Sequence, residues 1–434
     1  MWNQSPLPRL AIRLMNPNLR PEKHWRTLSG TIHGDINKER TGAEMNKFFQ
    51  NITDYFKPTE LLPAGVYQYQ TPSDAELQYR LHLRVADDGQ GLMIINASTI
   101  LHLNQTAAEY AYHLIRETPL EEAAGILSKR YQINRADARR DFIEISQKIM
   151  TLLEVPDLDP VSFLEFSRDD PYSIKPSVPY RLDCAITYKL SQNSTADLAP
   201  IRRVDQELTT EEWLSIIDRS WKAGIPHLIF TGGEPTLRDD LITLLSQAEK
   251  NGQVTGLLSD GYRFNDPEFR NEILQSGLDH LLFVLSPTDK DSWDALKAIL
   301  DEDLFTTVHI TINPEITSRL PQIIQNCKEL GANAISLSSS DPTNKILTQA
   351  LAGAQNLVAD ADLPLKWDLP VPYSAHNPIS IEIESSQNPV AGAGKAWFYV
   401  EPDGDVLPGQ GINQVRGNLL RDDWSKIWQD KSEE

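Results

Sequence analysis

The segment FTGGEP, residues 230–235, combines residue types that could hold a small ligand. It lies between an apolar stretch and a helical one. Gly232 and Gly233 permit positive φ angles and a close backbone approach, so a ligand could meet exposed amides and carbonyls. Glu234 adds a carboxylate, whereas Pro235 removes one donor. The same residues would also suit a tight turn that needs glycine only for its geometry. The segment alone therefore predicts either a binding loop or a turn without a ligand.

Polar side chains also gather on two later apolar stretches. Alternation along residues 306–312 puts the apolar side chains on one face and the polar ones on the other. With serines of the following stretch, the polar positions are Thr307, His309, Thr311, Asn313, Ser336, Ser338 and Ser340. Such a face could line a ligand-filled cavity, with Ser259, Asp260 and Ser286 near its rim. Hydroxyls bonded to backbone and buried water would explain it equally well, and His309 is expected to be a hydrogen-bonded core histidine.

Cysteine and histidine usage limits the metal chemistry that the sequence signals. Cys184 and Cys327 are the two cysteines, and they match no Cys-x-x-Cys spacing, so neither a disulfide framework nor a thiolate metal site is indicated. The nine histidines form no His-x-x-x-His pair, which argues against zinc.

The elements that must position these residues are strands and helices in alternation. Helical stretches such as residues 209–224 and 238–252 separate six apolar stretches. The predicted strands span residues 182–188, 227–232, 254–260, 280–286, 306–312 and 334–340. Six such units imply a parallel sheet, because each return crossover needs a helix. The candidate site then lies at the carboxyl ends of the strands, whether the sheet is an open barrel or doubly wound.

The residues before this series predict a small separate module. Residues 79–87 and 91–103 are typical of strands, and three helices follow. Capping signals at Thr106 and Thr118 predict the starts of the first two helices. We leave residues 1–61 unassigned.

The residues after the series predict a different pattern. A hairpin that turns at Asp403 and Gly404 is followed by a helix near the terminus. The predicted domains are therefore residues 62–155, a linker at 156–177, the parallel series at 178–362, and a C-terminal region at 363–434.

With TGGEPTL after its second strand, the series resembles the radical S-adenosylmethionine (SAM) enzymes over about residues 178–340. In that family the turn contacts the amino group of SAM, and the loop after the first strand carries Cys-x-x-x-Cys-x-x-Cys, which holds a four-iron four-sulfur cluster. Here the loop is AITYKLSQNSTAD, with Leu190, Ser194 and Asp197 at the cysteine positions. The resemblance assigns the remains of a SAM site to Gly232, Gly233, Glu234, Pro235, Ser259, Asp260, Ser286 and Asn313.

The C-terminal region resembles the SPASM or twitch extension of peptide-modifying members of that family. The resemblance rests on AGAGKAWFYVEPDGDVLPGQGINQVRGNLL. Cysteines for auxiliary clusters are expected near Ala391 and in the PGQG segment, where Gly409 stands. These positions also lack cysteine.

Residues 62–155 resemble the PqqD family of small domains that recognise leader peptides. The segment GLMIINASTILHLNQTAAEYAYHLI carries the resemblance. It implies a winged-helix-like α+β domain that takes a peptide as an extra strand beside an exposed sheet edge. The alternative is the same fold used only for packing.

Composition narrows the partners. Lys and Arg total 41 against 61 Asp and Glu, and the net charge of -20 opposes binding to a phosphate backbone, so nucleic acid is not an expected partner. No run of 18 apolar residues and no signal peptide is found, which predicts a cytoplasmic protein without a membrane partner.

These patterns predict a partial (β/α)6 TIM-like barrel of the radical SAM type between a PqqD-like domain and a degenerate SPASM/twitch hairpin. We expect a pseudoenzyme with no cofactor and no iron–sulfur cluster, which binds a peptide, a leader peptide or an active radical SAM paralogue during peptide or PQQ-like cofactor maturation. Whether the turn still holds SAM stays open. The alternatives are an active radical SAM enzyme with unusual cluster ligation, and a SAM or nucleotide binder without radical chemistry.

Overall fold

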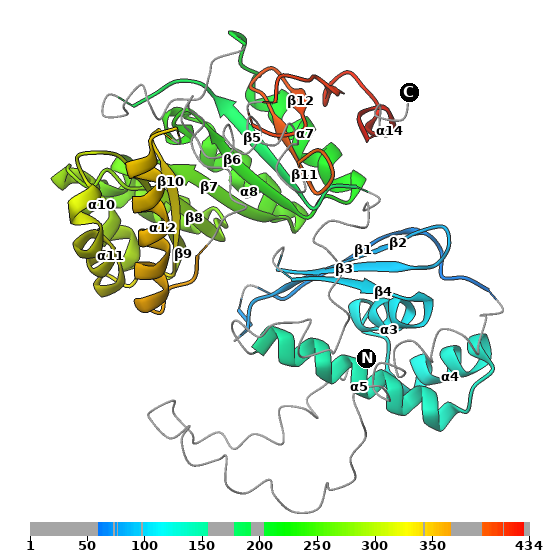
Figure 1. Ribbon diagram of the computed structural model, residues 1–434. Coiled ribbons are helices and arrows are strands. Elements are labelled where there is room, and N and C mark those ends of the chain that lie inside the picture. The colour runs from blue at the N-terminus through cyan, green and yellow to red at the C-terminus, as the bar shows by residue number, and fades with distance from the viewer. Residues whose placement is uncertain are drawn as a thin grey trace, which may run out of the picture. The chain divides into compact units, whose positions relative to one another are not determined.

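The computed structural model divides the chain into two compact units, one on each side of residue 168 (Figure 1). It describes residues 60–154, 178–191, 204–365 and 393–428, apart from Ser73, Glu76, Ala97, Ser98, Pro342 and Gly411. Residues 1–59 and the predicted linker at 156–177 lie outside the described residues. Each unit has a hydrophobic core of its own.

Over its described residues, the first unit is a four-stranded antiparallel sheet with three helices. Its elements are β1 (Gly65–Gln70), β2 (Arg80–Val85), β3 (Gly91–Ile95), β4 (Thr99–Leu103), α3 (Gln105–Ile115), α4 (Leu120–Tyr131) and α5 (Arg135–Glu154). Leu83 and Met93 of the sheet are buried with Ala111 of α3 and Ile149 of α5. The strands predicted at 79–87 and 91–103 and the three helices are confirmed, whereas β1 was not predicted.

The predicted helix caps of this unit are wrong. Asn104 caps α3, because its side-chain oxygen accepts a hydrogen bond from the Ala107 amide at 2.8 Å. Thr118 does not cap α4, which has no side-chain capping bond. The Thr118 hydroxyl instead lies 3.1 Å from Nδ1 of His113. In both cases a competing polar group nearby decided the outcome.

The second unit contains the six parallel strands in the predicted places. They are β5 (Arg181–Thr187), β6 (His227–Gly232), β7 (Val254–Ser259), β8 (His280–Val284), β9 (Phe305–Ile312) and β10 (Ala334–Ser339). The strand order β10-β9-β8-β7-β6-β5 follows the chain without reversal. A doubly wound sheet would reverse its order at a switch point, so the TIM-like alternative is correct. Since β5 and β10 are not neighbours in the described sheet, the barrel is open.

Helices follow the strands and cover their apolar face. They are α7 (Thr210–Ala223), α8 (Leu241–Asn251), α9 (Pro267–Gln275), α10 (Lys290–Leu300), α11 (Leu320–Glu329) and α12 (Lys345–Asp360). Leu182, Ile186 and Phe230 of the strands share one core with Trp213 of α7 and Leu244 of α8. Because every second strand residue serves this core, the alternate residues face inward and are free to be polar.

The C-terminal region extends the same sheet. β11 (Trp397–Val400) runs parallel to β5, and β12 (Asp405–Leu407) and β13 (Gly417–Asn418) continue beyond it. Gly404 has a φ of +85° and its amide donates to the Glu401 carbonyl at 2.8 Å, which confirms the predicted hairpin turn. The predicted terminal helix is α14 (Trp424–Trp428). The pairing of β11 with β5 was not predicted.

In the part of the chain that the structure describes, none of the helices combines the length and the apolar character needed to cross a membrane.

Candidate functional site

The Gly232–Gly233 turn packs backbone against backbone on the end of β5. Gly232 has a φ of +121°, and a Cβ added there would lie 2.1 Å from the Thr187 carbonyl oxygen. A Cβ on Gly233 would lie 2.0 Å from the carbonyl oxygen of Lys189. The Gly233 amide donates to Thr187 at 2.8 Å, and the Glu234 amide donates to Lys189 at 2.7 Å. Both glycines are therefore required by space, and Gly232 is required by its backbone geometry as well.

The hydrogen bonds of the turn leave an acceptor for a ligand, not a donor. The amides of Gly233 and Glu234 are used on β5 and the loop after it, Pro235 has none, and the Thr236 amide donates to the Glu234 carboxylate at 3.0 Å. The Gly233 carbonyl accepts no hydrogen bond from any residue that the structure describes. Such a turn suits an amino group and does not suit a phosphate.

Glu234 joins this turn to the end of β7. Its side chain is buried, and its carboxylate accepts from the Ser259 hydroxyl at 2.9 Å and from the Asp260 amide at 2.7 Å. Burial, together with the nearby Asp260 carboxylate, raises the pKa of Glu234 to about 8. Both oxygens are bonded within the protein, so Glu234 orients its own loop.

The predicted rim residues are brought together only in part. Asp260 follows β7 directly, and its carboxylate accepts from the Ser191 hydroxyl of the loop after β5. Ser286 lies after β8, where its amide donates to Ser292. Asn313 follows β9, and its side-chain oxygen accepts from the amides of Glu315 and Ile316 at 3.0 and 3.1 Å. Asn313 is therefore committed to its own turn, whereas Asp260 accepts both from the Tyr262 amide of its own turn at 3.3 Å and from Ser191 of another loop.

His309 is a satisfied core histidine, as predicted. Nδ1 lies 3.0 Å from the Ser336 hydroxyl and Nε2 lies 3.1 Å from the Ser338 hydroxyl, and the side chain is buried. Burial lowers the pKa of His309 to about 3, so the ring is neutral at physiological pH. The polar side chains on the inner face of β9 and β10 are thus hydrogen-bonded to one another.

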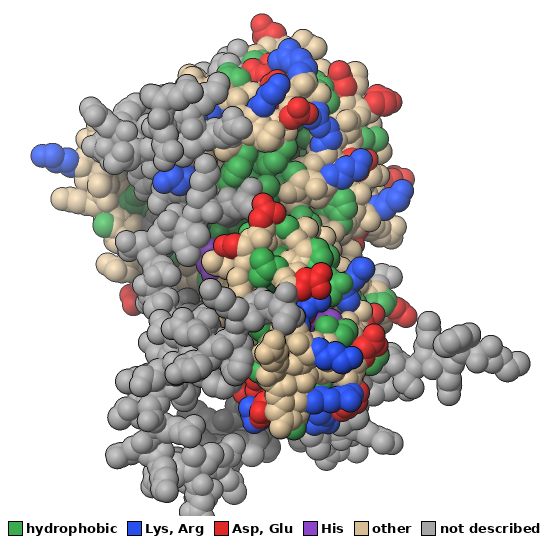
Figure 2. All heavy atoms as spheres, turned by 90° about the vertical axis from the view of Figure 1, so that its right-hand side faces the viewer, with side chains coloured by type: hydrophobic (Ala, Val, Ile, Leu, Met, Phe, Trp, Pro, Cys, Tyr) green, Lys and Arg blue, Asp and Glu red, His purple; other side chains and the backbone are tan. Residues whose placement is uncertain are grey.

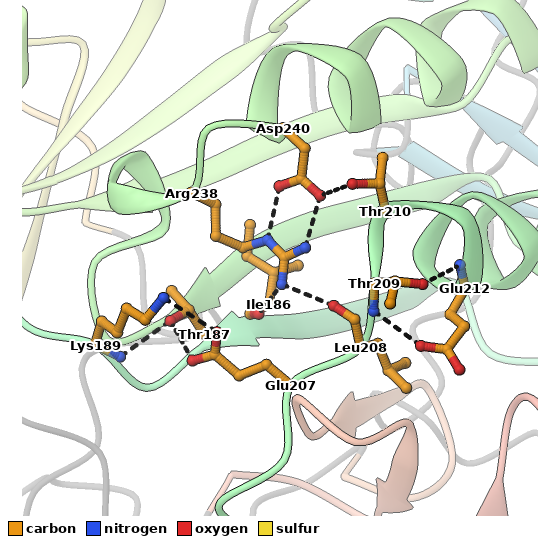
Figure 3. Close-up of polar contacts among 10 residues, drawn as sticks. All are labelled: Ile186, Thr187, Lys189, Glu207, Leu208, Thr209, Thr210, Glu212, Arg238 and Asp240. Atoms are coloured by element: carbon orange, nitrogen blue, oxygen red, sulfur yellow. Dashed lines mark hydrogen bonds and ion pairs between the residues drawn. The ribbon is translucent and has the colours of Figure 1, made fainter.

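A polar network beside the turn was missed by the sequence analysis (Figure 3). The Arg238 guanidinium binds Asp240 and two backbone carbonyls, those of Ile186 and Leu208. Glu207 accepts from the Thr187 hydroxyl at 2.6 Å. The available signal was the charged sequence RDD directly after the turn, which we interpreted only as the start of a helix.

The positions assigned to cluster cysteines are only partly described. Leu190 is 39% exposed, whereas Ser194, Asp197 and Ala391 lie outside the described residues. A Cβ on Gly409 would lie 3.3 Å from Cβ of Ala393, so the two segments of the predicted auxiliary site are adjacent. Within the described ranges, no group of three or more His, Cys, Asp or Glu residues is arranged to hold a metal ion.

Comparison with known proteins identifies the class of the second unit. Residues 184–285 match the model of the Radical SAM superfamily, so the second unit contains a radical SAM domain. The chain is 24% identical to the PqqA peptide cyclase of Bradyrhizobium diazoefficiens over 252 residues, 52% of this chain and 65% of that protein. It is 22% identical to the PqqA peptide cyclase of Gluconobacter oxydans over 262 residues, 54% of this chain and 70% of that one. The chain thus spans slightly less than two thirds of the first relative.

Solved structures share the fold. SuiB of Streptococcus suis bound to S-adenosylmethionine is 13% identical with a TM-score of 0.53, and the match covers 84% of this chain and 88% of SuiB. SuiB bound to the precursor peptide SuiA is 12% identical with a TM-score of 0.51, covering 81% of this chain and 87% of SuiB. At these identities the likeness establishes the fold alone.

These matches correct the cofactor prediction. We expected no cofactor and no iron–sulfur cluster, on the loss of cysteines. The match to the Radical SAM superfamily and the likeness to SuiB bound to S-adenosylmethionine contradict that expectation. The prediction rested on the cysteine positions alone, and these positions say nothing about the SAM turn.

The superfamily implies two bound groups, SAM and an iron–sulfur cluster, and the residues of this chain fit only the first. The open Gly233 carbonyl fits the amino group of SAM. A cluster held by three thiolates does not fit, because the chain has two cysteines and both are buried. Burial raises the pKa of Cys184, and it raises that of Cys327 to about 12, so neither is a ready thiolate.

Replacing Gly233 with alanine tests the backbone contact. Gly233→Ala should lower the free energy of unfolding of the second unit by about 1–3 kcal/mol, because the new Cβ overlaps the Lys189 carbonyl. Gly353→Ala is the control, since a Cβ there meets nothing within 4 Å. It should stabilise α12 by about 0.5–1 kcal/mol. Urea unfolding measures both, and equal effects would refute the contact.

Replacing Glu234 with glutamine tests its raised pKa. Because the folded-state pKa lies above the ordinary glutamate value of 4.5, the folded protein holds this proton more tightly than the unfolded chain. The corresponding stability is present below pH 4.5 and is lost as the pH rises toward 8. A pKa change of one unit corresponds to about 1.4 kcal/mol. Glu234→Gln should flatten the fall in stability between these two pH values, as measured by urea unfolding at each pH. The exposed Glu272→Gln is the matched control, and a wild-type slope in Glu234→Gln would contradict the assignment.

Proposed function

We propose that this chain binds SAM at the Gly232–Pro235 turn and a peptide through residues 62–155, and that it serves peptide modification without generating a radical itself. The turn carries the proposal, because a radical SAM domain presents there an open carbonyl and no open amide. The remaining residues of the predicted site, Ser259, Asp260 and Ser286, would line the same edge of the sheet, whereas Asn313 is committed elsewhere.

Charge favours SAM over a phosphate-bearing nucleotide at this turn. The carboxylates of Glu207, Asp260 and Asp289 lie in the segments that follow β5, β7 and β8, and the chain has a net charge of -20. The sulfonium of SAM is a cation that these carboxylates attract, whereas they repel phosphate groups. The SAM alternative is therefore preferred to a nucleotide.

The peptide half of the proposal is supported by the first unit and by the relatives. The resemblance to PqqD extends over a unit with its own sheet and core. In this sheet β1 and β4 each have one neighbour among the described strands, so the peptide would add as an extra strand beside one of these two edges. Relatives are named PqqA peptide cyclase, and SuiB was solved with a precursor peptide.

We propose that the chain carries out no radical chemistry because of where its two cysteine thiols lie. Reductive cleavage of SAM needs an electron donor beside its sulfonium. The buried Cys184 belongs to the core cluster between the strands and helices, and Cys327 lies on α11. The adjacent Gly409 and Ala393 support a SPASM-like origin of the C-terminal region, here without thiols.

Isothermal titration tests SAM binding. The wild-type chain should bind SAM and should bind ATP at least tenfold more weakly, since about 1.4 kcal/mol of charge repulsion suffices for that factor. Gly233→Ala should lose SAM binding, because the added Cβ disturbs the turn, while Gly353→Ala should retain it. A wild-type chain that does not bind SAM would refute this half of the proposal.

The same protein tests the chemistry. After anaerobic incubation with iron, sulfide and a strong reductant, SAM should be recovered intact by chromatography. Formation of 5′-deoxyadenosine would establish an active radical SAM enzyme with unusual ligation in place of the proposal.

Peptide binding is tested with leader peptides encoded beside the gene. The isolated residues 60–154, which carry all the described strands and helices of the first unit, should bind such a peptide as tightly as the full chain in fluorescence anisotropy. Binding by the full chain but not by residues 60–154 would place the peptide site elsewhere.

A further inference from the structure

Arg238 connects three segments that are separate in the sequence. Its guanidinium forms a two-bond fork with Asp240, from Nε to Oδ1 at 2.8 Å and from Nη2 to Oδ2 at 2.6 Å. Nη1 donates to the Ile186 carbonyl at 3.0 Å and to the Leu208 carbonyl at 3.1 Å. Figure 3 shows the guanidinium between these two carbonyls, with Asp240 on its other side. The side chain of Arg238 is 10% exposed, so these bonds are largely shielded from water.

The two carbonyls belong to the two ends of the loop between β5 and α7. Ile186 is the next-to-last residue of β5, and Leu208 immediately precedes Thr209, the N-cap of α7. The carbonyls that receive the Gly233 and Glu234 amides belong to Thr187 and Lys189, one and three residues after Ile186. Arg238 itself lies three residues after Pro235. One guanidinium thus fixes the β5 backbone on which the turn rests and the chain that follows the turn.

Asp240 orients this guanidinium instead of capping its own helix, α8. It occupies the N-cap position of α8, yet its side chain makes no capping hydrogen bond. Asp residues at this position normally stabilise a helix by about 1 kcal/mol. The carboxylate instead binds Arg238 and accepts from the Thr210 hydroxyl at 2.7 Å. Burial alone would raise the pKa of Asp240, but the hydrogen bonds from Arg238 and Thr210 outweigh it and hold this pKa below its usual value.

We propose that Arg238, oriented by Asp240, is the positioning residue of the SAM turn: it holds the Gly233 carbonyl where the amino group of SAM meets it. Arg238 does not contact the ligand. The inference rests on the proposed binding of SAM, and it predicts that affinity depends on the forked geometry of the guanidinium and not on its charge. A lysine at this position keeps the charge but has no planar fork for Asp240 and the two carbonyls.

The test is calorimetric titration of the full chain with SAM, in variants at both members of the pair. Arg238→Met and Arg238→Lys should each weaken SAM binding by about 10- to 100-fold, by analogy with the loss seen when the residues that orient metal ligands are replaced. Asp240→Asn should weaken it less, because the bonds to Ile186 and Leu208 remain. Guanidinium ion at millimolar concentration should restore part of the affinity in Arg238→Ala, and methylammonium should not.

Arg270→Met is the matched control. Arg270 likewise bonds a backbone carbonyl, that of Phe264 at 2.6 Å, and a carboxylate, that of Glu302 at 3.2 Å, but it does so on α9. It should lower the melting temperature without changing the SAM affinity. Equal SAM affinity in Arg238→Met and Arg270→Met overturns the inference, as does full recovery by Arg238→Lys. If Arg238→Met does not fold, unchanged affinity in Asp240→Asn overturns it. A wild-type chain that does not bind SAM instead refutes the proposed function.

Discussion

The contact between the Gly232–Gly233 backbone and the end of β5 is the constraint on which the carboxyl edge of the sheet depends. Two carbonyl oxygens occupy the space that side chains would need, and these same carbonyls accept the hydrogen bonds that join the turn after β6 to the end of β5. Glu234 extends these contacts to β7, and Ser191 reaches Asp260 from the loop after β5. A change at either glycine would therefore be felt on three strands, because backbone atoms cannot move aside as a flexible side chain can.

The inner face of the sheet is polar because only the outer face packs against the helices. The outward face of every parallel strand serves one apolar core with the helices. The inward face bears paired groups that would be costly to bury alone, such as His309 with its serines and His227, whose Nε2 lies 2.7 Å from that of His280. A Cβ at Gly256 would lie 2.3 Å from the His280 ring, so this glycine makes room for the pair. Polar residues on such a face therefore indicate hydrogen bonds within the protein and do not by themselves indicate a ligand.

Local sequence patterns were enough to predict the six parallel strands and the Gly404 turn. They did not predict contacts between segments that are distant in the sequence. The six parallel strands and the Gly404 hairpin were predicted because alternation, apolar runs and turn residues are local signals. β1 was missed, since its alternating Tyr67 and Tyr69 are half-buried and lack a continuous apolar run. The pairing of Trp397 with Arg181 joins residues more than 200 positions apart and leaves no local trace. Arg238 was missed for the same reason, because its carbonyl partners are defined only by the fold.

The prediction that no cofactor binds was wrong for a different reason. The cysteine positions and the SAM turn were treated as one unit, although different forces hold the two groups. Thiolate ligation depends on side chains, which a single substitution removes. The contact that we propose for the amino group of SAM is made by a backbone carbonyl, which survives any substitution compatible with the turn. The turn is retained here by packing against β5, by the buried Glu234 and by the Arg238 fork, none of which requires a metal. A site built from backbone does not depend on the side chains beside it, so the open Gly233 carbonyl would be available to the proposed SAM ligand whichever residue occupies position 190, here Leu190.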